Sequence, residues 1–146
     1  MRAIGSLGFI IGKMGVIGID YEFIDYSEAR LNSPSYKFTS ENKAVRDKYT
    51  STSNIRAGAE IKLQPLSIRA GWAYYGSPYR SSVKNDGSRM SYTFGLGFRD
   101  ENMFFDLAYI YTTTSEDYYP YDPNIVKPAV AESTASSFMM TLGFKF

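Results

Sequence analysis

Apolar and polar residues alternate along most of this chain. The pattern is most regular over residues 54–63, where the apolar phase holds Ile55, Ala57, Ala59, Ile61 and Leu63. The residues between them are polar, charged or glycine. Residues two positions apart share one face of a β-strand, so this alternation predicts a strand with one apolar face.

Six further stretches alternate in the same way: residues 6–11, 17–24, 66–75, 90–99, 103–111 and 138–146. Most approach the length of about 9–11 residues that a tilted strand needs to cross a membrane. Strands of soluble proteins are commonly about 5–6 residues long. The pattern predicts an all-β fold of about seven antiparallel strands, and the lengths favour transmembrane barrel strands over a soluble sandwich, which remains the alternative.

The connections between these stretches alternate in length. Short links fall at residues 12–15, 64–65 and 100–102, and long polar links at residues 27–53, 76–88 and 112–135. Outer-membrane barrels show this asymmetry, with short periplasmic turns and long extracellular loops. We therefore expect an up-and-down barrel wall with its C-terminus on the periplasmic side and its N-terminus on the extracellular side.

Charged residues occupy the non-apolar phase deep within the strands, where a barrel would have its lumen. They are Asp20, Glu22, Arg56, Glu60, Lys62, Arg69 and Asp106. We expect these side chains to form cross-strand ion pairs that hold the wall together and anchor a plug. The alternative is a functional role, in which they form a polar path through the lumen.

Composition excludes several classes of protein. The chain is 44% hydrophobic and 16% aromatic, yet its mean hydropathy is −0.27. It has no run of about 20 apolar residues for a transmembrane helix. A net charge of +1 does not indicate a nucleic-acid partner. The chain contains neither Cys nor His, so we expect no metal, no cofactor and no catalysis, although Asp20 and Glu22 resemble an acid–base pair.

Aromatic residues gather near both ends of the expected strands, as in the aromatic girdles of barrels. The outer group comprises Tyr74, Tyr75, Tyr79, Tyr109, Tyr111, Tyr118, Tyr119 and Tyr121, and the inner group comprises Phe98, Phe104, Phe144 and Phe146. The alternating ending with Leu142, Phe144 and Phe146 resembles the signal that the barrel-assembly machinery reads.

The domain organisation expected is one β-barrel segment over residues 1–146. No convincing signal peptide precedes the first strand. Single-chain bacterial barrels normally have an even number of strands, whereas seven are counted here. Both observations predict a chain that is truncated at its N-terminus.

Several motifs together resemble the FadL/TodX family of outer-membrane fatty-acid and hydrocarbon transporters. They are IGIDYEF at residues 17–23, DYS at 25–27, IRAGAE at 55–60, SIRAGWAY at 67–74, GSP at 76–78, FGLGF at 94–98 and FDLAY at 105–109. Their order and spacing match the family across nearly the whole chain. The resemblance implies the last half of a fourteen-stranded monomeric barrel that is plugged by an N-terminal hatch.

The resemblance also implies a function and a location. The intact protein would lie in the outer membrane of a Gram-negative bacterium, in contact with its lipids. It would take up hydrophobic compounds such as long-chain fatty acids by passive diffusion, and an arginine of the lumen would bind the fatty-acid carboxylate. The alternative is a small outer-membrane barrel with a structural or adhesive role at the cell surface.

Overall fold

The chain forms one seven-stranded sheet in which each strand pairs antiparallel with the next. The computed structural model describes residues 1–118, 125 and 129–145. The strands are β1 (Arg2–Ile11), β2 (Gly15–Asp25), β3 (Ser51–Leu63), β4 (Leu66–Tyr75), β5 (Arg89–Arg99), β6 (Met103–Tyr118) and β7 (Ala129–Phe144). The predicted all-β, up-and-down antiparallel fold is confirmed.

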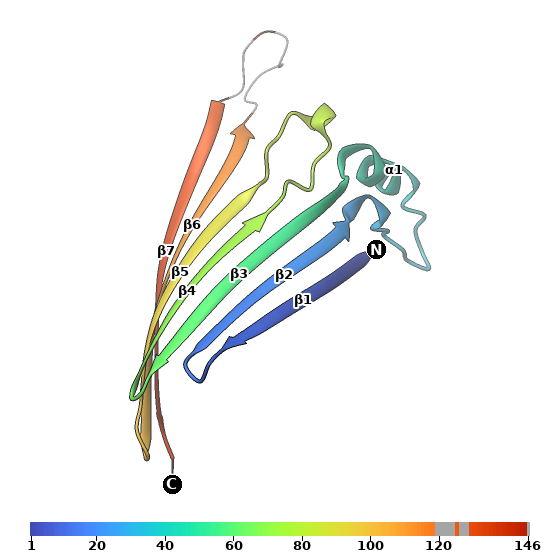
Figure 1. The fold of residues 1–146 in the computed structure, drawn as a ribbon. Coiled ribbons are helices and arrows are strands. Elements are labelled where there is room, and N and C mark those ends of the chain that lie inside the picture. Colours follow the sequence, from blue (N-terminus) through green and yellow to red (C-terminus); the bar gives the residue numbers. More distant parts are fainter. Residues whose placement is uncertain (119–124, 126–128, 146) are drawn as a thin grey trace.

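Figure 1 shows a single curved sheet with the long connections at one end and the short turns at the other. The first residue lies at the loop end and the last at the turn end. β1 and β7 each pair with one strand only, so the sheet has two open edges among the described residues. Because seven strands alternate in direction, β1 and β7 run the same way.

The pairing register aligns the apolar phases of neighbouring strands on one side of the sheet. Ile19 lies opposite Ala57, Ala57 opposite Trp72, Trp72 opposite Tyr92, and Tyr92 opposite Tyr111. We call this side the apolar face. The opposite side, with Asp20, Arg56 and Arg69, is called the polar face.

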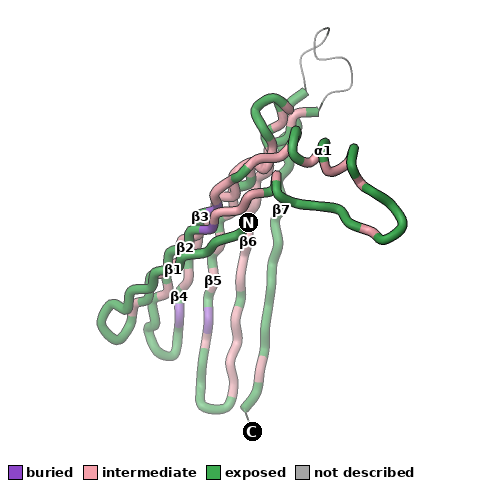
Figure 2. The backbone as a smooth tube through the Cα atoms, turned by 90° about the vertical axis from the view of Figure 1, so that its right-hand side faces the viewer, coloured by how far each residue is buried: buried purple, intermediate pink, exposed green. Residues whose placement is uncertain are grey.

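The burial pattern is the reverse of that in a soluble domain. No apolar residue of the described part of the chain is buried, whereas Glu22, Asn54 and Ser67 are only 2%, 5% and 8% exposed. On the apolar face Phe94 and Leu96 are 59% and 55% exposed. Figure 2 accordingly shows mostly exposed and half-buried backbone with a few short buried segments. The sheet has no apolar core of its own, so its apolar face requires an apolar environment.

The prediction of a long loop over residues 112–135 is wrong. β6 continues to Tyr118 and β7 already begins at Ala129, so the two strands form a hairpin that extends beyond β5. Residues 112–115 are threonine and serine, which break the apolar alternation but suit a strand. Pairing between the two strands satisfies their backbone groups and decides the conformation.

The loop between β2 and β3 contains structure that the alternation did not predict. Helix α1 (Thr39–Lys48) lies within it and has no buried residue. Figure 2 shows α1 projecting to one side of the sheet. Among the described residues, no helix combines the length and the apolar character needed to cross a bilayer.

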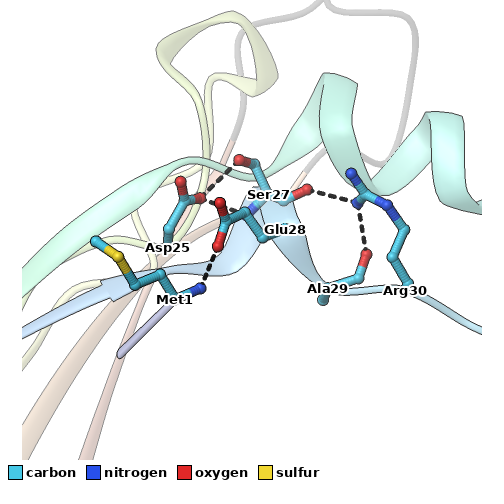
Figure 3. Close-up of polar contacts among 6 residues, drawn as sticks. All are labelled: Met1, Asp25, Ser27, Glu28, Ala29 and Arg30. Atoms are coloured by element: carbon cyan, nitrogen blue, oxygen red, sulfur yellow. Dashed lines mark hydrogen bonds and ion pairs between the residues drawn. The ribbon is translucent and has the colours of Figure 1, made fainter. Parts of the chain in front are cut away.

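A short 3-10 turn, η1 (Tyr26–Glu28), fixes the start of this loop at the end of β2 (Figure 3). The Asp25 carboxylate accepts hydrogen bonds from the Ser27 backbone N–H at 2.9 Å and from its hydroxyl at 2.6 Å. Arg30 donates to the carbonyl oxygens of Ser27 and Ala29 at 2.9 and 2.8 Å. Glu28 pairs with the amino group of Met1, which ties the loop to the start of β1.

The long loops also contact one another. The backbone N–H of Thr50 donates to the Pro78 carbonyl at 2.9 Å, and that of Arg80 donates to the Lys48 carbonyl at 2.9 Å. The rings of Tyr49 and Tyr79 lie 5.3 Å apart. These contacts join the loop before β3 to the loop after β4 in one ordered rim.

Candidate functional site

The polar face carries two clusters of charged side chains. The cluster nearer the loop end is centred on Glu22, whose carboxylate accepts hydrogen bonds from Arg2 at 2.5 Å, Asn54 at 3.2 Å and Arg56 at 3.3 Å. Arg56 also lies 3.6 Å from Asp20, the residue directly opposite it on β2. Because Arg56 contacts both carboxylates, Asp20 and Glu22 form part of an ion-pair network, and this favours a structural role over acid–base chemistry.

The second cluster lies nearer the turn end and is centred on Arg69. Its Nε lies 2.6 Å from Glu60, and its Nη1 lies 2.6 Å from Asp106. Lys62 Nζ lies 3.5 Å from the other oxygen of Glu60. All seven charged residues that the sequence predicted on the polar face thus take part in ion pairs, and the expected cross-strand pairs are present.

Two glycines of β5 allow Arg69 to reach Asp106, because β5 lies between the strands that carry them. Arg69 is opposite Gly95, and Asp106 is opposite Gly97. A Cβ on Gly97 would lie 2.7 Å from Asp106 Oδ1 and against the Ser67 hydroxyl. A Cβ on Gly95 would lie 3.4 Å from Arg69 Cβ. Because Gly95 and Gly97 carry no side chain, the Arg69 guanidinium can pass over β5 to Asp106.

A groove of about 670 Å³ lies on the polar face between the two clusters. Its floor includes Gly18, Gly58 and Gly71, which are consecutive cross-strand partners on β2, β3 and β4. The ion-paired side chains Asp20, Arg56, Glu60 and Arg69 line it, together with the apolar side chains Val16 and Ile110. The groove therefore combines an apolar surface with charges that are already paired.

Arg89 and Tyr75 mark the loop end of the polar face. They are cross-strand partners on β5 and β4, and the Arg89 guanidinium carbon lies 4.2 Å from the centre of the Tyr75 ring. Tyr75 lies at the outer end of β4, as predicted, and its ring is on the polar face, where it lines the groove. Arg89 lies two residues before Ser91 and therefore shares the polar phase of residues 91–99. The sequence alone could have placed it on the polar face.

Two more participants were missed by reasoning from sequence. Arg2 precedes the first predicted strand, although it continues the phase of Ser6 back towards the N-terminus of β1 (Arg2–Ile11). Asn54 was recognised as lying on the face opposite Ile55, but nothing in its type indicated that it donates to a buried carboxylate.

The expected assembly signal lies at the end of β7. Leu142 and Phe144 are 55% and 60% exposed, in phase on the apolar face, while Phe146 lies outside the described residues. Between them Gly143 lies on the polar face beneath the ring of Phe104. Phe104 of the expected inner aromatic group thus lies on the polar face. Two residues of the expected outer group, Tyr119 and Tyr121, lie outside the described residues.

No protein-family model, no curated protein sequence and no solved structure matches this chain. In the part of the chain that the structure describes, no group of three or more acidic residues is placed to hold a metal ion.

Proposed function

We propose that this sheet is part of the wall of a transmembrane β-barrel in the outer membrane of a Gram-negative bacterium. Its apolar face contacts lipid, and its polar face lines a passage for hydrophobic compounds such as long-chain fatty acids, which cross by passive diffusion. The resemblance to the FadL/TodX transporters agrees with this proposal and supplies the substrate class. The barrel-assembly machinery inserts the protein.

The distribution of charge between the two faces carries the proposal. On the apolar face of the strands the charged residues are Asp25, Asp117 and Glu132, and all three lie at the loop end. Every other charged strand residue that pairs within the sheet lies on the polar face. A charged side chain facing the middle of a bilayer costs about 2–4 kcal/mol, so this segregation suits a lipid-facing wall. A soluble sheet would bury the apolar face beneath a second layer.

The open edges are consistent with the same proposal. Unpaired backbone groups cannot remain exposed to lipid, so a spanning sheet must close on itself. Because β1 and β7 run in the same direction, closure with antiparallel neighbours requires an odd number of further strands. Such strands come from the same polypeptide or from another chain.

Cysteine labelling tests the proposal directly, since the chain has no cysteine of its own. Ala70 and Ala73 lie on β4, on the apolar and polar faces respectively. In membranes containing the protein, Ala73→Cys should react with a water-soluble thiol reagent, whereas Ala70→Cys should react only with a lipid-soluble one. Equal reaction of both variants with the water-soluble reagent would exclude a lipid-facing wall.

The ordered rim favours a second candidate, a structural or adhesive barrel at the cell surface. Helix α1 presents ten residues without burying any, and the neighbouring loops are joined by hydrogen bonds. Replacement of residues 31–48 by a glycine–serine linker should abolish adhesion of cells under this alternative and leave uptake of hydrophobic compounds unchanged under the first proposal.

A further inference from the structure

Positive charge gathers in the long connections at the loop end of the sheet. Residues 27–50 and 76–88 together hold seven lysines and arginines but four aspartates and glutamates, whereas the whole chain holds 16 and 15. Five of these cations form a surface that we call the basic rim: Lys37, Lys43, Arg46, Lys48 and Arg80. All five residues are exposed, and among the described residues no carboxylate lies within 4.0 Å of their charged groups.

Hydrogen bonds join the two connections that carry the basic rim. The Arg80 backbone N–H donates to the Lys48 carbonyl at 2.9 Å, and Arg80 Nε donates to the Tyr49 carbonyl at 3.0 Å. The Arg80 side chain is therefore fixed at the C-terminal end of α1. Lys43 and Arg46 are three residues apart on the same helix, so they lie close to one another on its exposed surface. The cations thus belong to one ordered surface.

The glutamates of this region are engaged elsewhere. Glu28 pairs with the amino group of Met1. Glu41 accepts hydrogen bonds from the hydroxyls of Tyr36 at 3.1 Å and Ser40 at 3.0 Å. Neither carboxylate therefore forms an ion pair with a cation of the basic rim, and the positive charge of this surface faces the solvent.

Helix stability explains only part of this charge. Arg46 and Lys48 lie in the last turn of α1, where cations interact favourably with the helix dipole. Lys37, Lys43 and Arg80 lie outside that turn, so the dipole does not account for them. A surface that keeps several cations without acidic partners is suited to a negatively charged partner.

An exposed aromatic ring lies next to Lys37. The ring centres of Tyr36 and Phe38 are 4.7 Å apart in an edge-to-face arrangement, and the Tyr36 hydroxyl is bound to Glu41. The ring is thus held at its side and at its tip, yet Tyr36 is 52% exposed. A tyrosine held in this way offers a flat apolar surface, against which the C–H groups of a sugar can pack.

We propose that the basic rim binds an acidic polysaccharide, a polymer whose sugars carry carboxylate or sulfate groups. The cations are spread along a helix about 15 Å long and onto a second loop. They do not converge on one small anion, whereas the acidic groups of a polymer can contact them in succession. This inference does not depend on the proposed passage, and it names the partner chemistry that the adhesive candidate would need.

Titration of the full protein, purified from membranes in detergent, tests this assignment. The probes are fluorescent dextran sulfate, uncharged dextran and duplex DNA, and fluorescence anisotropy reports binding. At physiological ionic strength we expect dextran sulfate to bind more tightly than the other two probes. Added salt should weaken this binding, because it screens exposed charges.

Substitutions in the rim test which residues are responsible. The combined change Lys43→Gln, Arg46→Gln and Lys48→Gln removes three charges from α1. Exposed ion pairs are weak singly, so the three changes together should weaken binding of dextran sulfate about tenfold. Tyr36→Ala should weaken it severalfold, whereas Tyr36→Phe keeps the ring and should preserve binding.

A second triple variant provides the matched control. Lys13→Gln, Arg99→Gln and Lys145→Gln together remove three exposed cations near the turn end of the sheet. The net charge falls by the same amount, while the basic rim stays intact. Gel mobility without heating checks that each variant is folded.

Weaker binding of dextran sulfate by the α1 variant, with unchanged binding by the control variant, supports the assignment. Equal weakening in both variants would show that net charge alone attracts the polymer, and it would overturn the assignment. Absence of dextran sulfate binding, or tighter binding of duplex DNA, would overturn it as well. Uptake of hydrophobic compounds by the unsubstituted protein is measured alongside and tests the passage alone, so the two proposals can fail separately.

Discussion

Arg69 of β4 and Asp106 of β6 form a 2.6 Å ion pair across the intervening strand β5. They are not cross-strand neighbours, and the contact exists because Gly95 and Gly97 leave β5 bare on the polar face. The pair is part of a chain of contacts that links Glu60 on β3, Arg69 on β4 and Asp106 on β6, and it passes over β5 near the turn end of the sheet.

A side chain at position 97 should break this contact. Gly97→Val places atoms where Asp106 Oδ1 and the Ser67 hydroxyl now lie. Because the ion pair is partly exposed, we expect a loss of about 1–2 kcal/mol in the free energy of unfolding. Urea titration followed by tryptophan fluorescence measures it. Gly8→Val is the control, since Gly8 lies on the same face with nothing within 4 Å of an added Cβ; equal destabilisation by both changes would contradict the explanation.

The two carboxylates of the other cluster should contribute unequally. Glu22 is nearly buried and accepts three hydrogen bonds, whereas the Asp20 side chain is 43% exposed and lies 3.6 Å from Arg56. Glu22→Gln should cost about 1–3 kcal/mol, and Asp20→Asn less than about 1 kcal/mol. Urea midpoints of the two variants give the comparison. A larger effect at Asp20 would show that burial does not set the strength of these contacts.

A charged side chain on the apolar face should destabilise the folded protein in a bilayer. Leu96 and Thr93 lie on opposite faces of β5, so Leu96→Arg faces lipid while Thr93→Arg faces the lumen. The first change should cost about 2–4 kcal/mol, a penalty that the second does not carry. The folded fraction in lipid vesicles, read from gel mobility without heating, reports the difference. Identical folded fractions for the two variants would rule out the barrel interpretation.

Assembly should depend on the apolar face of β7. Phe144→Ser removes an exposed ring next to the C-terminus, and deletion of Phe146 removes the terminal ring of the signal expected from sequence. Both changes should lower the amount of protein in the outer membrane. Met139→Ser changes the polar face of the same strand and should have little effect. Normal outer-membrane levels of both Phe variants would show that these residues form an ordinary strand end and do not act as an assembly signal.

The open edges of β1 and β7 should be covered in the membrane. In a closed barrel, amides of both strands that point away from β2 and β6 are hydrogen-bonded and exchange slowly with deuterium. Hydrogen exchange of the membrane-embedded protein, with peptides from β3 as the internal reference, measures this. Rapid exchange confined to β1 and β7 would mean that the sheet stays open.

Much of the fold could be predicted because a strand in a one-sided environment has a strict period of two. The stretches at residues 54–63 and 66–72 show it without a break, and the structure has β3 and β4 there. The prediction failed over residues 112–118 and 129–135, where threonine, serine and alanine follow no phase. There β6 and β7 extend past the end of β5 and form backbone hydrogen bonds with each other. The strands continue because of this pairing, which the alternation of apolar residues does not reveal.

The candidate site, like the fold, could be predicted only in part. The sequence by itself determined which side chains share the polar face, because alternation assigns Asp20, Glu22, Arg56, Glu60, Lys62, Arg69 and Asp106 to one phase. Only the tertiary structure decided which of them meet. Register places Arg56 opposite Asp20, and the bare backbone of β5 lets Arg69 reach Asp106. Register also places Arg89 opposite Tyr75 and over its ring. Alternation fixes the direction of a side chain, whereas its partners depend on hydrogen bonding between strands that lie far apart in the sequence.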